Sequence, residues 1–259
     1  MNARRSLLSL ALVLATASGS AAAQGWRTAS RASVGLAPDP ATTPEAVVQV
    51  YAARAVRWRG YIGVHTWIAV KPSDASAFTV YEVNGWRLRR NGTSVLRSER
   101  TADGRWYGNS PELLADIRGD SVDAVIERID AVVNDYPDAR EYRVWPGPNS
   151  NSFTAYVLRN IPELRVDLPA TAIGKDYLGM RLIAGTPSGT GFQLSAFGLL
   201  GVLAGIEEGL EVNVLGLTFG IDPLDLSLKV PLAGRVHLAW LLLLGLAIVW
   251  RHKRAKAQA

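Results

Sequence analysis

The chain of 259 residues is long enough for one sizeable domain or two small ones, and 48% of its residues are hydrophobic, which excludes disorder as its main state. The absence of cysteine excludes disulfide bridges, a thiolate nucleophile and metal centres built on sulfur. Two of the three histidines flank an apolar segment near the C-terminus, so the sequence predicts neither a metal site nor a cofactor.

The net charge of +5 comes from the two ends of the chain. Residues 1–23 carry two arginines and residues 251–259 carry four basic side chains, with no acidic residue in either segment. The part between them holds 22 basic and 23 acidic residues. The charge therefore does not indicate a nucleic-acid partner.

Residues 1–23 have the pattern of a secretory signal peptide. Arg4 and Arg5 precede an apolar run, and small residues end at Ala23. Whether the route is the general or the twin-arginine one stays open. Residues 24–45, rich in Ser, Ala, Pro and Thr, follow as a predicted linker to the exported domain.

Residues 236–250 are almost wholly apolar and lead directly into the basic tail 251–259. This pattern predicts one transmembrane helix with the tail in the cytoplasm and the domain on the periplasmic side. We therefore expect a single-pass inner-membrane protein. The alternative is a buried core helix that ends in a basic tail.

Residues 46–230 are predicted to form an exported α+β domain, in which an antiparallel sheet packs against helices. Period-two patterns predict strands at 46–53, 61–70 and 78–83, with a short one at 142–145. Helices are predicted from Ser110 to Gly119, from Ser121 to Pro137 and from 149 to 159. Residues 210–221 alternate too, and a slip in phase at Val214 and Leu215 predicts a β-bulge.

His65 is the one imidazole outside the C-terminal segment. Strand alternation places it beside Trp67, opposite the aliphatic face of strand 61–70. Ser150 follows a Pro-Gly-Pro turn and opens the third helix, where free N–H groups stabilise an anion. The alternatives are a structural histidine and a serine that only caps the helix.

Two resemblances bear on these residues. The motifs VVQVYAARA, VHTWIAVK, VWPGPNSN and GLEVNVLGLTFGID occur in this order, and the chain closely resembles a bacterial membrane-associated family called domain of unknown function 3750, whose name implies no activity. More distantly, His65 on a strand followed by Ser150 at a helix start resembles the permuted papain-like hydrolases, including lecithin–retinol acyltransferase and desumoylating peptidase relatives.

The papain-like resemblance implies a permuted papain-like fold with His65 as base and Ser150 at the position of the nucleophile. That position is cysteine in those enzymes, and a serine there needs stronger activation. Glu82 or Asn84, on the strand after the predicted turn, is the candidate for the group that orients His65.

Three hypotheses of function follow. The first is a membrane-anchored envelope domain that has lost thiol chemistry and binds a ligand or partner. The second is a serine-based hydrolase or acyltransferase acting on an amide or ester of envelope lipid or peptidoglycan. The third is a structural envelope protein whose apolar residues 192–221 pack against a membrane partner. The predicted partners are thus the membrane, an envelope lipid, peptidoglycan or a membrane protein.

Overall fold

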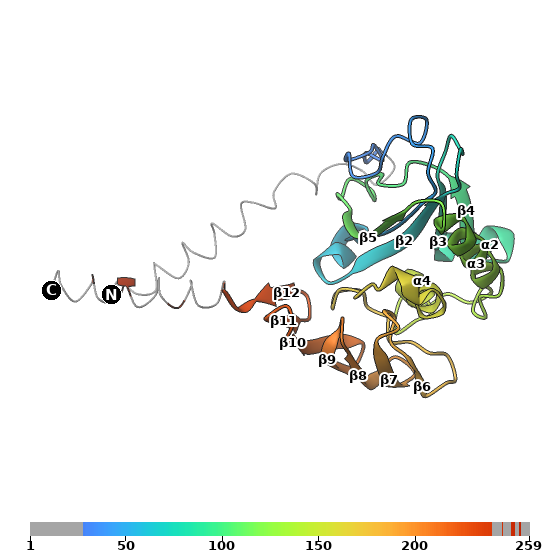
Figure 1. Ribbon diagram of the computed structural model, residues 1–259. Coiled ribbons are helices and arrows are strands. Elements are labelled where there is room, and N and C mark those ends of the chain that lie inside the picture. The colour runs from blue at the N-terminus through green and yellow to red at the C-terminus, as the bar shows by residue number, and fades with distance from the viewer. Residues whose placement is uncertain (1–27, 240–244, 246–249, 252–253, 255–259) are drawn as a thin grey trace.

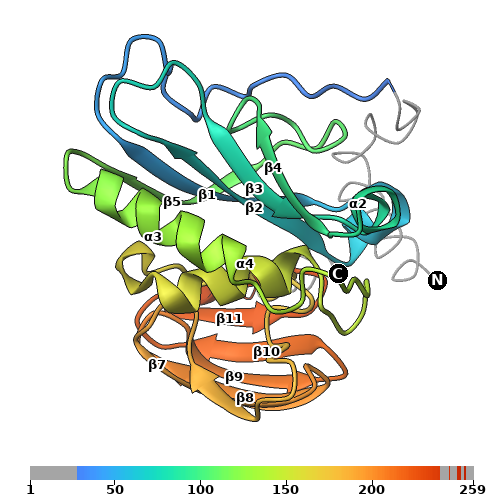
Figure 2. The same ribbon diagram turned by 90° about the vertical axis from the view of Figure 1, so that its right-hand side faces the viewer.

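The computed structural model describes residues 28–239, 245, 250–251 and 254. Within these residues, two antiparallel sheets enclose a layer of helices (Figure 1). Figure 2 shows α3 (Val122–Asn134) and α4 (Ser150–Asn160) lying between the sheets, with the five-stranded sheet on one side and the seven-stranded sheet on the other.

The first sheet has the strand order β4-β3-β2-β1-β5. Its strands are β1 (Val47–Arg54), β2 (Val64–Lys71), β3 (Thr79–Val83), β4 (Val95–Glu99) and β5 (Glu112–Arg118). Alternation along β1 and β2 gives this sheet two buried faces. Val48, Val50 and Ile68 face the helices, whereas Tyr51 and Trp67 face the loops that carry Ala102 and Trp106.

Helix α3 buries Val125, Ile126 and Ile129 in the core on the helix side of the first sheet, as its apolar spacing predicts. Helix α4 begins at a capping box in which the side chains of Asn149 and Ser152 each bond the other residue's backbone. The remaining helical segments are short. They are η1 (Arg57–Tyr61), α2 (Gly85–Asn91) and η2 (Pro162–Leu164).

The second sheet is an antiparallel meander with the strand order β12-β11-β10-β9-β8-β7-β6. Its strands are β6 (Ile183–Gly185), β7 (Gly191–Ala196), β8 (Leu200–Gly205), β9 (Gly209–Val214), β10 (Leu217–Asp222), β11 (Ser227–Val230) and β12 (Gly234–His237). Its polar residues point toward α4 and its apolar residues point to solvent: Glu211 and Asn213 are buried, whereas Leu210 and Val212 are exposed.

Several local predictions need correction. Residues 112–118, expected in a helix, form the edge strand β5, because pairing with β1 outweighs the local helix-start signal. The phase slip at Val214 is not a bulge but a two-residue hairpin: Leu215 and Gly216 have φ of 54° and 77° and connect β9 to β10. Residues 142–145 do not form a strand.

The predicted fold class also needs correction. The described residues form twelve strands in two sheets and three α-helices, not one sheet with packed helices and a C-terminal transmembrane helix. The predicted span is interrupted at its start, because Val236 and His237 belong to strand β12. In the described part of the chain, no helix is long and apolar enough to cross a membrane.

The expected single-pass inner-membrane location rested on that span, and the same finding overturns it. The predicted signal peptide, most of residues 240–250 and most of the basic tail lie outside the described residues. The part of the predicted linker that is described contacts the domain: the Asp103 carboxylate accepts hydrogen bonds from the Ser33 hydroxyl and from the backbone N–H groups of Leu36 and Ala37.

Candidate functional site

A cavity with a volume of about 810 Å³ lies between the two sheets. Residues of β1, β2 and β5 form its floor, and the hairpin of β11 and β12 forms its roof. The segment from Asp167 to Thr171 closes one side. A cavity of this size, bounded by two sheets, suits a small-molecule ligand.

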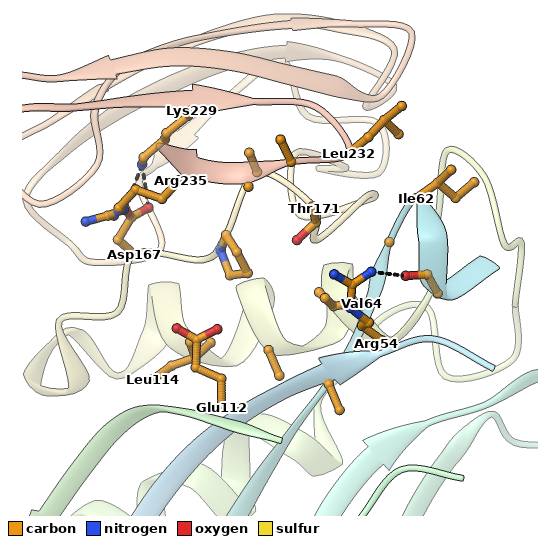
Figure 3. A pocket seen from close by; sticks show the side chains of 18 of the residues that line it. Arg54, Ile62, Val64, Glu112, Leu114, Asp167, Thr171, Lys229, Leu232 and Arg235 are labelled. Carbon is orange, nitrogen blue, oxygen red and sulfur yellow. Dashed lines mark hydrogen bonds and ion pairs between the residues drawn. The ribbon is translucent and has the colours of Figure 1, made fainter. Parts of the chain in front are cut away.

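The floor presents two opposite charges (Figure 3). Ala52 pairs with Glu112 across β1 and β5, and Arg54 lies two residues beyond Ala52 on the same face of the sheet. This diagonal arrangement separates the two Cα atoms by roughly 7–8 Å. Both side chains are exposed and line the cavity, and no ion pair joins them in the part of the chain that the structure describes.

Neither charge is neutralised elsewhere. One guanidinium nitrogen of Arg54, Nη1, donates to the carbonyl oxygen of Gly60 at 3.0 Å, which holds the side chain over the cavity floor and leaves its other N–H groups open. The carboxylate of Glu112 has no hydrogen-bond or ion-pair partner among the described residues. An unpaired cation and an unpaired anion therefore face one space.

The side and roof are charged as well, but their groups are paired. The ammonium group of Lys229 contacts Asp167 at 2.7 Å and Glu211 at 2.6 Å, and it donates to the carbonyl oxygen of Glu208 at 2.8 Å. Arg235 contacts Asp167 and also pairs with Asp225. Burial raises the pKa of Asp167 to about 6, although Lys229 and Arg235 pull it down.

His65 lies outside this cavity, on the opposite face of the first sheet. Its Nε2 bonds Glu82 Oε2 at 2.9 Å, and its ring stacks on Trp106 with the centroids 3.7 Å apart. Arg100 approaches the same carboxylate at 3.4 Å. Burial raises the pKa of Glu82, but the hydrogen bond and charge of His65 outweigh it with the help of Arg100, so the pKa lies below its ordinary value.

The structure brings His65 to Glu82 but not to Ser150. Thr66, the next residue on β2, donates to the backbone oxygen of Ser150 at 3.3 Å and to Asn151 Oδ1 at 3.1 Å. Because adjacent strand residues point to opposite faces, His65 points away from α4. The side chain of Asn84 caps α2 by accepting from the N–H of Arg87.

The cavity residues are the ones that the sequence analysis missed. Arg54 lies at the end of a strand, and Glu112 lies in a segment that the sequence analysis predicted to be helical. Asp167 and Lys229 belong to no recognisable sequence motif. One pattern in the sequence indicates a buried charge on the second sheet: a charged residue stands between apolar residues of a strand, as Glu211 does in β9 and Lys229 does in β11. Among the described residues, no three His, Asp or Glu side chains are grouped so that they could hold a metal ion.

The comparisons with known proteins add a family but no activity. No curated protein and no solved structure matches the chain. The match to a family model covers residues 45–177, just over half of the chain. These residues contain the first sheet with helices α3 and α4, and the seven-stranded sheet follows them. By this match, the chain belongs to the family described as protein of unknown function (DUF3750).

Proposed function

We propose that the chain is a binding protein for a small zwitterion, a molecule with a carboxylate and an ammonium group, which it takes up in the cavity between the sheets. The observation that carries the proposal is the pair of opposite, unneutralised charges on the cavity floor. Arg54 would bind the carboxylate with two N–H groups, and Glu112 would bind the ammonium group. An amino acid or a short peptide has this charge pattern.

The fixed charges of the side and roof support this proposal. Lys229 and Arg235 are held by carboxylates, so they shape the cavity without giving it a net charge of one sign. A ligand of one sign would leave either Arg54 or Glu112 without an ion-pair partner. A zwitterion satisfies both groups at once.

The geometry gives no such support to a serine-based hydrolase. A nucleophile needs its base within hydrogen-bond reach, and β2 separates the His65 side chain from helix α4. The envelope lipid, peptidoglycan and membrane-protein partners stay predictions from sequence.

The test is a calorimetric titration of the full-length chain with three probes that share the alanyl-alanine backbone and differ in their terminal groups and charges. The dipeptide alanyl-alanine carries both charges, its N-acetyl form lacks the ammonium group, and its C-terminal amide lacks the carboxylate. We expect the dipeptide to bind at least tenfold more tightly than either blocked form, a difference of about 1.4 kcal/mol or more.

Two variants test which cavity residue binds which charged group of the dipeptide. Arg54→Gln should bring the affinity for alanyl-alanine down to that for its amide, and Glu112→Gln should bring it down to that for the N-acetyl form. Arg140→Gln and Glu127→Gln, which remove exposed charges elsewhere, serve as matched controls and should change nothing. If alanyl-alanine does not bind, or if it binds equally well to both cavity variants, the proposal fails.

A further inference from the structure

The seven-stranded sheet exposes its apolar face. Cross-strand register aligns Ile183, Leu194, Val202, Val212 and Phe219 in one row over five strands. Val212, in the middle strand β9 of the seven-stranded sheet, is 47% exposed and Phe219 is 49% exposed. A contiguous apolar surface of this kind on a folded protein marks a binding surface.

The neighbouring row has the same character. Phe192, Ala204, Leu210, Ile221 and Leu228 follow one another across β7 to β11. Strands β7 to β10 have six residues each, so at a rise of about 3.3 Å per residue they are about 20 Å long, and five strands roughly 4.8 Å apart span about 25 Å. Over the full length of these strands the outer face covers about 500 Å². Two such faces packed together bury about 1,000 Å², the size at which specific protein interfaces begin.

The opposite face of this sheet holds buried ion pairs, so the apolar face must be the outer one. Glu211, on the other face of β9, accepts from Lys175 Nζ at 2.5 Å and from Lys229 Nζ at 2.6 Å, and all three side chains are buried. Reversing the strand would leave buried ammonium groups without their carboxylate, which is strongly destabilising. The apolar face is therefore a fixed outer surface that resembles the inner face of one sheet of a β-sandwich.

The composition of the face argues against a lipid surface as its cover. Surfaces that lie on membranes carry Lys or Arg and the amphipathic rings of Trp or Tyr at their borders. From residue 182 to 234 the chain has no Trp, Tyr or Arg, and its one lysine is the buried Lys229. Exposed Trp145 borders the sheet at the turn between β9 and β10, and Arg235 of β12 is held by Asp167 and Asp225. The free basic side chains that would meet lipid headgroups are missing from residues 182–234.

We infer that the outer face of the seven-stranded sheet binds the same face of a second copy of this chain. An identical copy supplies the missing layer of the sandwich: a sheet of the same length, the same Leu, Val, Ile and Phe side chains and the same lack of charge. A two-fold axis that lies between the two faces, parallel to the strands, places each row against its counterpart, with the sheets about 10 Å apart. Figure 2 shows that this face points away from α4 and from the first sheet, so dimerisation leaves the cavity between the sheets intact.

The first experiment uses the absence of cysteine in the natural chain. Val212→Cys places one thiol on the outer face, and Arg89→Cys places one on the exposed side of α2 as a matched control. Intact cells that express each full-length variant are treated with a short bis-maleimide before any detergent is added. We expect a covalent dimer of twice 27.9 kDa for Val212→Cys and only the monomer for Arg89→Cys.

The second experiment puts a charge into the face. Val212→Lys should abolish the dimer in sedimentation analysis of the full-length chain, whereas Glu127→Lys, which places the same residue on the exposed side of α3, should keep it. Val212 is already exposed in one copy, so the circular dichroism spectrum should stay unchanged. The unfolding midpoint should fall to that of the wild type at concentrations where it is monomeric and no further, because only the stabilisation by dimerisation is lost.

Three results would overturn the inference. One is a wild-type chain that is monomeric. Another is a dimer that survives Val212→Lys, because it would then use another surface. The third is flotation with phosphatidylcholine–phosphatidylglycerol vesicles that Val212→Lys abolishes while no dimer forms, because lipid would then cover the face.

Discussion

At the scale of single residues, the surroundings of a charged group decide what it does. His65 is buried between Glu82 and the ring of Trp106, and this pairing stabilises a buried carboxylate on the face of the first sheet that points away from α4. Arg54 and Glu112 lie on the other face and keep their charges open to the cavity. His65, the candidate base of the sequence analysis, therefore lies outside the cavity, whereas Arg54 and Glu112, which the sequence analysis did not single out, line it.

Asp167 makes the stability of the chain depend on pH. Its pKa is about 6 in the folded chain against an ordinary value of 3.8, so the folded state binds its proton more tightly. The stability that this proton contributes is complete below pH 3.8 and is lost as the pH rises through 6, by about 3 kcal/mol in all.

Asp167→Asn removes this dependence because an amide does not ionise. We expect the wild type to lose about 2–2.5 kcal/mol of unfolding free energy relative to Asp167→Asn between pH 4 and pH 7. Urea denaturation of both proteins at several pH values measures the difference. A constant difference across this range would contradict the prediction.

At the scale of elements, helix α4 shows how a cap is built. The Asn149 side chain accepts from the N–H groups of Asn151 and Ser152, and its amide donates to the carbonyl oxygens of Val144 and Ile173. The helix start is thus joined to the preceding loop and to the segment before the second sheet. The Ser150 hydroxyl has no hydrogen-bond partner among the described residues, so this serine is not the cap.

The two neighbouring residues should therefore respond differently to truncation. Asn149→Ala removes the cap together with the two hydrogen bonds to the carbonyl oxygens of Val144 and Ile173, and we expect a loss of about 2–3 kcal/mol in unfolding free energy. Ser150→Ala is the matched control and should cost less than about 1 kcal/mol. Denaturant unfolding of both variants at pH 7 measures the two losses, and equal losses would refute this account of the helix start.

At the scale of the whole molecule, the layers are joined by polar contacts. On one side, Thr66 of the first sheet bonds α4; on the other, Arg159 of α4 donates to Gln193 of the second sheet at 2.7 Å. Buried Glu211 joins Lys229 of the second sheet to Lys175 of the connecting segment. We expect the layers to unfold together, because each depends on contacts with the next.

Glu211→Gln tests this coupling from the second sheet. Removing one carboxylate charge from between two buried ammonium groups should cost about 3–5 kcal/mol. The second sheet contains no tryptophan, whereas Trp67 and Trp106 lie in the core of the first. The midpoint detected by tryptophan fluorescence should fall together with the midpoint detected by circular dichroism, and Glu127→Gln should move neither. A fluorescence midpoint that stays in place would show that the sheets unfold separately.

The sequence by itself determined the elements that local pattern controls. The strands near 46–53, 61–70 and 78–83, the helix after Ser121 and the helix start at Asn149 lie within a few residues of their predicted positions. Alternation also placed His65 and Trp67 on one face of their strand, opposite the aliphatic residues. These features depend on backbone periodicity and capping, which neighbouring residues decide.

Only the tertiary structure decided which face of each sheet meets the core. Alternation in 210–221 shows that a strand has one polar and one apolar face, but it does not say which face is buried. Here the polar face is buried, because Glu211 on that face forms ion pairs with the buried ammonium groups of Lys175 and Lys229. The tertiary structure also decided three contacts that local pattern does not predict. Strand β5 pairs with β1, His65 bonds Glu82, and Arg54 lies near Glu112 on neighbouring strands. Each of these contacts joins residues that lie far apart in the chain.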